Sequence, residues 1–482
     1  MMAQNKQCPI LDAAVLERFP HVDAVKLQRL LDAAVAGDKH KIIVLDDDPT
    51  GVQTVHDLSV YTDWSYESVR QGFLEERKMF YILTNSRGFT EEETSKAHRE
   101  IAKTVAQVAQ ELQQSFLLVN RSDSTLRGHY PLETQVLKDQ WEAESGQAVD
   151  GEILCPYFKE GGRFTLGNVH YVRYGEQLVP AGETEFAKDK TFGYCASDLT
   201  EYIEEKTGGA YRSENVTTIS LEELRNLQVE AITAKLLRVS GFGKVVVNAV
   251  DACDVKVFCL ALYQALGRGK RFLFRTAAGL VKELGAVADR PLLTREDMLE
   301  RPLTTGGIIV VGSHTLKTTQ QLERLKELPG ICSLEFNSDL VLEEERFAEE
   351  IESVLQREEA LLQSGKTVVV YTKRKLLSME GDSKEAALRR SVKISDAVQS
   401  LVGKLRVTPA FVVAKGGITS SDIGTKALKV KRAHVLGQVR PGIPVWQTGK
   451  ESKFPRIPYV IFPGNVGEVD TLREVVSVLM GL

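Results

Sequence analysis

From residue 41 onward, the chain alternates between short apolar runs and segments with helical periodicity. Each apolar run ends in a polar or glycine-rich turn, as buried parallel strands do. One segment repeats apolar residues at spacings of four, three and four, at Ile101, Val105, Val108 and Leu112. This alternation predicts an α/β fold with mainly parallel sheets flanked by helices. The strands expected in the first half are residues 42–45, 79–83, 116–119, 245–250 and 272–274.

A polar run with two prolines, at residues 289–306, interrupts the alternation and marks a boundary between two lobes. We therefore expect a helical lead-in at 1–40 and domains at 41–300 and 301–482, with a cleft between the lobes. The stretch at about 128–190 is rich in Gly, Pro and Tyr, and we interpret it as an irregular insertion in the first domain. The second domain is expected to contain strands at 308–311, 367–371, 411–414 and 459–462, and helices around 318–328, 343–362, 384–402 and 469–479.

Composition excludes several classes of protein. At 482 residues the chain exceeds the usual size of one hydrophobic core, which agrees with two domains. The net charge of −5 is small and Lys and Arg are dispersed, so no nucleic-acid surface is expected. The absence of an apolar run of about 18 residues and of a leader-like N-terminus predicts a cytoplasmic protein without a membrane segment. The six cysteines lack CxxC spacing and are interpreted as free thiols.

Three glycine-containing turns follow predicted strands of the second domain. They are Gly312-Ser313-His314, the run from Lys415 to Ser420, and the run from Pro463 to Gly467. Parallel sheets bind ligands at the carboxyl ends of their strands, where helix N-termini present free N–H groups. Each turn alone fits an ordinary strand-to-helix turn, but three in one domain predict a nucleotide or anion site.

The second domain has no P-loop. Gly365, Lys366 and Thr367 resemble the end of that motif, but Ala360 stands where its first glycine belongs, and a strand follows instead of a helix. We therefore expect any ATP to be held without a P-loop.

Three consecutive carboxylates, Asp46, Asp47 and Asp48, follow the first predicted strand. Adjacent carboxylates repel one another, a cost that Mg2+ or a substrate hydroxyl offsets. The alternative is a solvated turn capped by one Asp, with Pro49 and Gly51 setting the bend. We favour a functional role and leave the metal ligands unassigned.

Arginines follow the next two strands. Arg87 follows the second, and Arg121 and Arg127 flank Asp123 and Ser124 after the third. A guanidinium binds a carboxylate through two parallel hydrogen bonds, and Asp and Ser bind hydroxyls. Each Arg alone fits a surface ion pair, but together with the Asp run they predict a site for a small polyhydroxy acid.

These segments together resemble the four-carbon acid sugar kinase family, whose members phosphorylate threonate, erythronate or 3-oxo-tetronate with ATP. The motifs that carry the resemblance are DDDPTG at 46–51, NSRG at 85–88, RSDSTLRG at 121–128, GRFTLGNVHYV at 162–172, TEFAKD at 184–189, GSHT at 312–315, KGGITS at 415–420 and PGNVG at 463–467. The resemblance implies an N-terminal domain that binds the sugar acid and a C-terminal domain that binds the nucleotide.

By motif, the resemblance also implies roles for single residues. Asp47 or Asp48 would contact substrate, as would Asp46, Arg87, Arg121, Asp123, Ser124 and Arg127. The implied contacts with ATP are Ser313, Gly416, Gly417, Ile418, Thr419 and Gly464. The chain departs from the common pattern in its greater length, in Ile418 where Glu is frequent, and in Arg121 where Lys is frequent. These departures affect the expected substrate more than the expected kinase chemistry.

The mechanism expected from these residues is in-line phosphoryl transfer. Asp48, or in second place Asp47, would accept the proton of the attacking hydroxyl, and Arg87 and Arg127 would hold the acid. ATP and Mg2+ are the expected cofactors. The expected partners are the sugar acid and ATP, without nucleic acid or membrane, and a homodimer is left open.

Two other classes remain open. In a haloacid-dehalogenase-like phosphohydrolase, Asp46 and Asp48 would form the aspartyl-phosphate motif, with Thr84 and Asn85 as the next motif. That family's later Lys and acidic pair are missing here. A catalytically silent sugar-acid binding protein is the third class.

Overall fold

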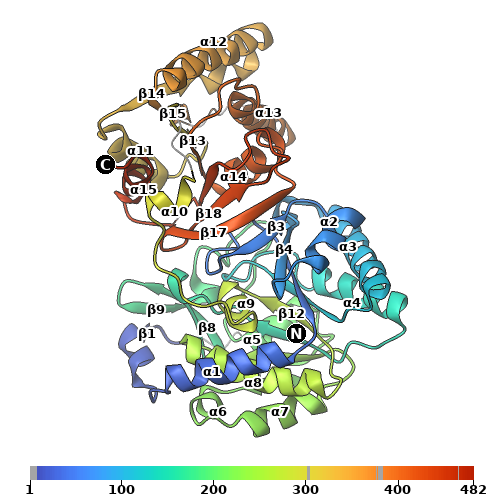
Figure 1. Ribbon diagram of the computed structural model, residues 1–482. Coiled ribbons are helices and arrows are strands. Elements are labelled where there is room, and N and C mark those ends of the chain that lie inside the picture. Colours follow the sequence, from blue (N-terminus) through green and yellow to red (C-terminus); the bar gives the residue numbers. More distant parts are fainter. Residues whose placement is uncertain (1–7, 301–303, 376, 378–383, 465) are drawn as a thin grey trace. The chain divides into compact units, whose positions relative to one another are not determined.

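The computed structural model describes residues 8–300, 304–375, 377, 384–464 and 466–482. The chain forms two compact units, both of mixed α/β structure (Figure 1). Unit 1 comprises Met1–Gly51 and Asp63–Asp289, and unit 2 comprises Val52–Thr62 and Arg290–Leu482. The α/β class predicted from the sequence is confirmed. Among the described residues, no helix is both long and apolar enough to cross a membrane.

Unit 1 is built on a parallel sheet with the strand order β10-β11-β6-β12-β5-β2-β4. Its central strands are buried along almost their whole length, because helices cover both faces. The strands of this sheet are β2 (Lys41–Asp46), β4 (Met79–Leu83), β5 (Phe116–Arg121), β6 (Gly151–Cys155), β10 (Thr217–Ile219), β11 (Gly243–Val247) and β12 (Phe272–Thr276).

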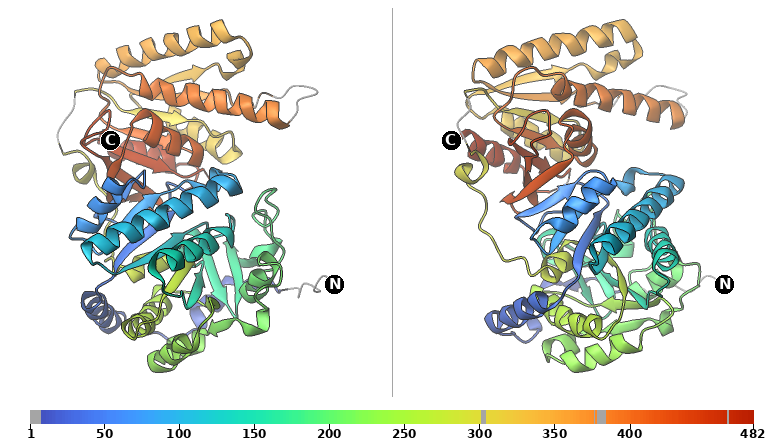
Figure 2. Two further views of the ribbon diagram at one scale, coloured as in Figure 1. Left: turned by 90° about the vertical axis from the view of Figure 1, so that its right-hand side faces the viewer. Right: turned by 45° about the vertical axis from the view of Figure 1, so that its right-hand side comes forward.

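Two groups of helices cover the sheet of unit 1 (Figure 2). In the first group α3 (Glu91–Leu112) packs on α4 (Leu132–Ser145) and α2 (Tyr66–Leu74). In the second, α8 (Ala252–Gly267) packs on α7 (Val229–Arg238) and α1 (Ala24–Gly37). Right-handed crossovers in opposite directions along the sheet place the two groups on opposite faces. The remaining α-helices are α5 (Leu199–Lys206), α6 (Leu221–Arg225) and α9 (Ala278–Leu284).

The stretch 128–190, interpreted from its composition as irregular, contains α4, β6 and most of a small antiparallel sheet. That sheet has the order β1-β9-β8-β7. Many Gly and Tyr residues of the stretch 128–190 lie in tight turns or in strands that are exposed on one side. The small sheet therefore has no continuous apolar run that the sequence could reveal. The strands are β1 (Leu11–Asp12), β7 (Arg163–Leu166), β8 (Val169–Tyr174) and β9 (Gln177–Pro180).

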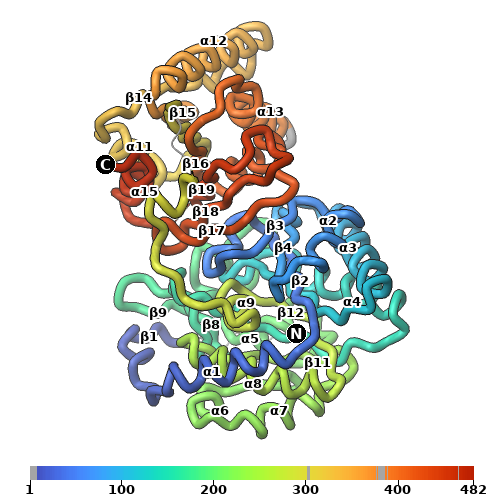
Figure 3. Tube along the Cα trace, viewed as in Figure 1, coloured from blue at the N-terminus to red at the C-terminus, as the bar shows by residue number. Residues whose placement is uncertain are grey.

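Unit 2 combines a parallel sheet with an antiparallel extension. The parallel part has the order β14-β15-β13-β16-β19, and the antiparallel part continues through β18 and β17 to β3. Figure 3 shows β3, from early in the chain, beside β17. The strands are β3 (Leu58–Tyr61), β13 (Ile308–Val311), β14 (Ile331–Phe336), β15 (Thr367–Thr372), β16 (Val412–Lys415), β17 (Arg432–Arg440), β18 (Ile443–Thr448) and β19 (Pro458–Phe462).

The helices of unit 2 pack in pairs. The helix α11 (Leu316–Lys326) contacts α15 (Thr471–Met480), and α12 (Glu344–Gln363) contacts α13 (Lys384–Gly403). The short helices are α10 (Arg295–Met298) and α14 (Gly417–Asp422). A core of buried aliphatic and aromatic side chains joins the sheet to α11 and α15; it includes Ile309, Leu322, Val413, Val460, Phe462, Leu472 and Val476.

Candidate functional site

The polar residues predicted in unit 1 lie at the carboxyl ends of three adjacent strands, β5, β2 and β4. Parallel strands share one polarity, so the residues that follow β12, β5, β2 and β4 meet along one edge of the sheet. Asp46, the last residue of β2, pairs in register with Arg121, the last residue of β5. Arg121 in turn pairs with Thr276 at the end of β12. The sheet therefore brings together side chains that are far apart in the sequence.

Arg87 and Arg121 tie the three consecutive aspartates together. The Arg87 guanidinium donates from Nη2 to Asp47 Oδ1 at 2.7 Å and from Nε to Asp47 Oδ2 at 3.2 Å. Arg121 Nη1 donates to Asp46 Oδ1 at 3.2 Å and to Asp47 Oδ1 at 3.4 Å. The two-point contact fixes the orientation of Asp47. In this structure, both arginines are engaged by the protein's own carboxylates.

Asp46 is the most enclosed of the three carboxyl groups, with 1% of its surface exposed. Burial raises its pKa to about 8. The charge of Arg121 opposes this shift, and the charges of Asp47 and Asp48 add to it. Gly51 closes over it: a Cβ at that position would lie 2.0 Å from both carboxylate oxygens of Asp46. The turn after β2 therefore requires glycine at this place.

Asp48 is the most accessible of the three, with 18% of its side chain exposed. Its Oδ1 accepts hydrogen bonds from the backbone N of Thr50 at 2.8 Å and from Thr50 Oγ1 at 2.6 Å. Its Oδ2 lies 3.3 Å from Arg87 Nη1. Burial opposes ionisation, but the Arg87 charge and the Thr50 hydrogen bonds more than compensate, so the pKa of Asp48 is lowered. By contrast, burial raises the pKa of Asp47 despite its arginine partners.

The loop after β5 carries a second acidic and basic pair. Arg127 Nε donates to Asp123 Oδ2 at 2.8 Å, and Thr125 Oγ1 also donates to that oxygen. Burial would raise the pKa of Asp123, but the charges of Arg87 and Arg127 and these hydrogen bonds hold it well below its usual range. Ser124 is buried, and its carbonyl oxygen lies 2.8 Å from Nε2 of His170.

Two further arginines, to which the sequence argument assigned no role, belong to this group. Arg275 on β12 donates from Nη2 to the carbonyl oxygen of Arg127 at 2.8 Å. Arg163 begins β7, and its guanidinium lies 5.6 Å from the centre of the Phe186 ring. The Nε atoms of both arginines are buried without a hydrogen-bond partner among the described residues. Arg275 directly follows the apolar run 272–274, a signal in the sequence that the prediction missed.

In unit 2, the three predicted glycine turns follow β13, β16 and β19, which are adjacent strands. Thr318 Oγ1 lies 3.2 Å from Ser313 Oγ and 3.4 Å from the carbonyl oxygen of Gly464. Gly416 has a φ of 118°, and a Cβ at Gly312 would lie 2.4 Å from Thr419 Oγ1. The first and third turns are therefore joined through Thr318, and the first and second are in contact.

The remaining predicted nucleotide contacts differ in their surroundings. Gly417 begins α14, and the side chain of Ile418 is 75% exposed. Asn465, which belongs to the third turn, lies outside the described residues.

Two basic side chains strengthen this part of unit 2. Lys415, at the end of β16, is fully buried, and its Nζ donates to the carbonyl oxygens of Pro463 at 2.6 Å and Gly464 at 3.1 Å. Burial, and to a smaller extent the charge of Lys317, lowers its pKa to about 7. Arg374, after β15, donates to the carbonyl oxygen of Ser313, and its Nη1 is buried without a partner among the described residues. Neither residue was among the predicted contacts.

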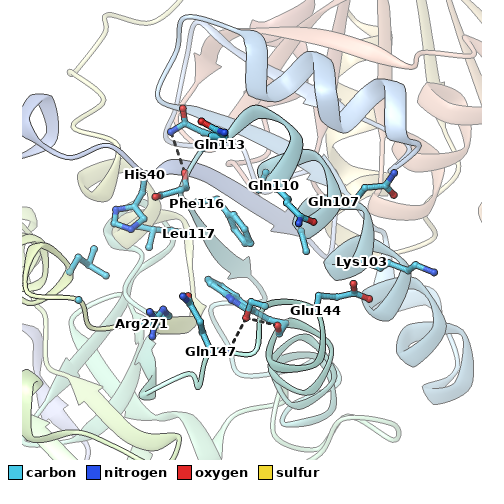
Figure 4. Close-up of a pocket in the computed structure, with 18 of the residues that line it drawn as sticks. His40, Lys103, Gln107, Gln110, Gln113, Phe116, Leu117, Glu144, Gln147 and Arg271 are labelled. Atoms are coloured by element: carbon cyan, nitrogen blue, oxygen red, sulfur yellow. Dashed lines mark hydrogen bonds between the residues drawn. The ribbon is translucent and has the colours of Figure 1, made fainter.

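A hollow of about 790 Å³ in unit 1 lies away from these groups (Figure 4). It is lined by Phe116 and Leu117, at the start of β5, together with side chains such as Gln110, Gln147 and Arg271. Arg121 is at the opposite end of the same strand. The hollow is therefore separate from the strand ends that carry the Asp and Arg residues.

Comparison with known proteins gives matches to both halves of the chain. A family model described as a sugar-binding N-terminal domain matches residues 42–284, and one described as a nucleotide-binding C-terminal domain matches residues 308–472. No curated protein matches the chain in sequence.

Solved structures share the fold. Haemophilus influenzae protein HI1011, assigned to the family DUF1537, is 18% identical with a TM-score of 0.60, covering 91% of this chain and 100% of its own. A Salmonella typhimurium LT2 protein, provisionally described as a tRNA synthase, is 16% identical with a TM-score of 0.64, covering 90% of this chain and 98% of its own. A Bordetella bronchiseptica DUF1537 domain with bound citrate, a domain-swapped dimer, is 20% identical over 91% of this chain and 98% of its own, and its TM-score of 0.38 is too low to support a comparison.

Proposed function

Because the chain belongs to the four-carbon acid sugar kinase family, we propose that it transfers the terminal phosphoryl group of ATP to a hydroxyl of a small sugar acid. Residues 42–284 match a sugar-binding domain and residues 308–472 a nucleotide-binding domain, which supports two ligands held by different parts of the chain. The proposed acid has four carbons, as in threonate, erythronate or 3-oxo-tetronate.

The observation that carries the proposal is the gathering of Asp and Arg side chains at one edge of the unit 1 sheet. A polyhydroxy acid needs cations for its carboxylate and acceptors for its hydroxyls, and this edge supplies both. The glycine turns of unit 2 supply what a triphosphate needs: backbone N–H groups, hydroxyls and the buried Lys415. Transfer then requires that the two bound ligands meet.

We assign proton acceptance to Asp48. As the acceptor hydroxyl oxygen bonds to the γ-phosphorus, the bond from that phosphorus to the β–γ bridging oxygen of ATP breaks, ADP leaves, and the hydroxyl proton passes to Asp48. Asp48 is ionised because its pKa is lowered, and it is the most accessible of the three carboxylates.

In this scheme, Mg2+ would bind together with ATP, through the phosphates of the nucleotide. Among the described residues, no group of three or more His, Cys, Asp or Glu side chains is arranged to hold a metal ion. Mg2+ commonly binds through substrate phosphates and waters with few protein ligands. We therefore assign no Mg2+ ligand to this chain.

The hydrolase alternative is disfavoured by the state of Asp46. An aspartyl-phosphate nucleophile must be ionised and reachable by phosphate, whereas Asp46 is buried beneath Gly51, and burial raises its pKa to about 8. No observation favours the catalytically silent protein over the kinase.

A screen of four- to six-carbon sugar acids for ATP-dependent release of ADP tests the proposal. We expect ADP and a phosphorylated acid in equal amounts with at least one four-carbon acid. Release of inorganic phosphate from sugar phosphates without nucleotide would instead support the hydrolase. Tight binding of acid with no ADP formed would support the silent binding protein.

A further inference from the structure

Arg163 is a partly buried arginine for which the described residues supply no ion-pair partner. It is the first residue of β7, where its backbone N donates to Phe158 O at 2.9 Å and its own carbonyl accepts from Phe158 N at 3.1 Å. Its Nε is buried without a hydrogen-bond partner, and no carboxylate among the described residues forms an ion pair with it. Burying an unpaired charge is costly, so such a group points to a ligand of opposite charge.

The electrostatic surroundings of Arg163 lead to the same conclusion. Burial lowers the pKa of Arg163; the carboxylate of Asp123 opposes this shift, and the positive charge of Arg127 adds to it. Asp123 is hydrogen-bonded to Arg127 and also interacts with Arg87. Asp123 is therefore shared among several guanidinium groups, and Glu185 is the other carboxylate whose charge acts on Arg163, without an ion pair between them.

Arg127 and Arg163 approach the same aromatic ring. Their guanidinium carbons lie 5.1 Å and 5.6 Å from the centre of Phe186, a half-buried side chain. The ring can hold both planar cations by cation–π attraction. Arg127 Nε donates to Asp123, but its terminal nitrogens and the guanidinium of Arg163 are able to donate hydrogen bonds to a ligand. Two guanidinium groups placed in this way can donate hydrogen bonds to the two oxygens of a carboxylate.

The buried His170 links the strand that follows Arg163 to the loop that carries Arg127. His170 on β8 lies with Nε2 2.8 Å from the carbonyl oxygen of Ser124 and Nδ1 3.0 Å from Thr165 Oγ1. Burial lowers its pKa to about 4, so the ring is neutral and its Nε2–H donates to Ser124. The small sheet that carries Arg163 is thereby linked to the loop that carries Arg127.

We propose that Arg163, together with Arg127 on the Phe186 ring, binds the carboxylate of the substrate and so selects an acid over a neutral polyol. This inference rests on the proposed sugar-acid kinase function and deepens it. Arg87 and Arg121 have a different task, because they are already engaged by Asp46 and Asp47 and hold those carboxylates in place. Within the site, Arg163 is a specificity residue contributed by the small antiparallel sheet.

The test compares an acid with its uncharged analogue by calorimetry in the absence of nucleotide. Threonate, erythronate and threonamide are titrated into the wild-type protein and into the variants Arg163→Gln, Arg163→Lys and Arg173→Gln. Arg173 on β8 is the matched control, because it belongs to the same sheet and its side chain is 42% exposed. Thermal unfolding of each variant establishes that it is folded.

We expect Arg163→Gln to bind the preferred acid about 30-fold more weakly or worse, with little change for threonamide. Arg163→Lys should recover part of the loss, since it restores the charge without the fork. Arg173→Gln should behave as the wild type. A folded Arg163→Gln variant with wild-type affinity for the acid, or equal losses for acid and amide, would overturn the inference.

The calorimetry and the ADP-release screen together separate this inference from the kinase proposal. Acid binding that depends on Arg163 without any ADP formation would support the carboxylate site and refute the kinase. ADP formation by the wild type, with an unchanged acid affinity in Arg163→Gln, would support the kinase and refute the carboxylate site. A wild-type protein that binds no acid in a three- to six-carbon panel would overturn both.

Discussion

The buried Nζ of Lys415 donates a hydrogen bond to the carbonyl oxygen of Pro463 at 2.6 Å, which joins the turn after β16 to the turn after β19. Burial lowers the pKa of this lysine to about 7, so at pH 8 most of it is neutral in the free protein. An ATP triphosphate bound at these turns would raise that pKa and make the lysine take up a proton.

We therefore predict that ATP binding at pH 8 is accompanied by uptake of up to about one proton. Calorimetry in buffers with different ionisation enthalpies measures this number. Lys415→Met should abolish the uptake and weaken ATP binding, whereas Lys404→Met, at a surface position that is 52% exposed, should change neither. Equal proton uptake in Lys415→Met and wild type would place the titrating group elsewhere.

Asp47 and Asp48 should respond differently to replacement by Asn. Asp48→Asn should lower kcat about 100-fold or more with little effect on ATP affinity, because the amide keeps an acceptor for Thr50 but cannot take a proton. Asp47→Asn removes the carboxylate that contacts both Arg87 and Arg121, and we expect the free energy of unfolding to fall by about 3 kcal/mol.

Steady-state kinetics and urea unfolding of the two variants separate these effects. The assignment of Asp48 would be wrong if Asp48→Asn retained normal kcat, or if kcat and ATP affinity fell in parallel.

Gly51 and Gly88 form a matched pair for the packing of the acidic turn. A Cβ at Gly51 would lie 2.0 Å from the Asp46 carboxylate oxygens, whereas a Cβ at the exposed Gly88 would meet nothing within 4 Å. Gly51→Ala should lower the free energy of unfolding by about 1–3 kcal/mol, since the turn must shift to relieve the overlap. Gly88→Ala should stay within about 0.5 kcal/mol of wild type in the same measurement.

The buried His170 should make the protein less stable in mild acid. Its pKa is about 4 in the folded protein against an ordinary value of 6.5, so between these pH values the unfolded chain binds a proton that the folded chain does not. Stability therefore falls as pH decreases through this window, and the contribution of His170 between pH 7 and pH 5 is roughly 2 kcal/mol.

Urea unfolding at pH 7 and pH 5 measures that loss. His170→Gln keeps a donor for the Ser124 carbonyl but does not titrate, so its loss of stability between the two pH values should be smaller by that amount. An identical pH dependence in His170→Gln and wild type would mean that His170 is already protonated in the folded protein.

The sequence alone was sufficient to place the elements whose hydrophobic pattern is local. The runs 79–83 and 308–311 correspond to β4 and β13 without a shift, and the residues after the runs 42–45 and 116–119 are the Asp and Arg residues of the site. Continuous apolar runs of this kind arise because helices cover both faces of these strands. The two-domain α/β class followed from the same pattern.

Elements that depend on distant partners were not predicted. β3 is a short segment that gains its hydrogen bonds from β17, more than 350 residues later in the chain. The strands β7, β8 and β9 are partly polar and become regular only by pairing with one another. The helical lead-in expected at 1–40 contains α1, and it also contributes β1 to that small sheet.

The sequence by itself determined the residue types of the site, because Asp, Arg and Gly residues at strand ends are recognisable from local spacing. Only the tertiary structure decided their partners: Arg87 and Arg121 are engaged by aspartates of the protein, while the Nε of Arg163 has no hydrogen-bond partner among the described residues. The physical reason is that charge compensation depends on distances across the fold and on exclusion of water, and neither is encoded in the spacing of residues along the chain.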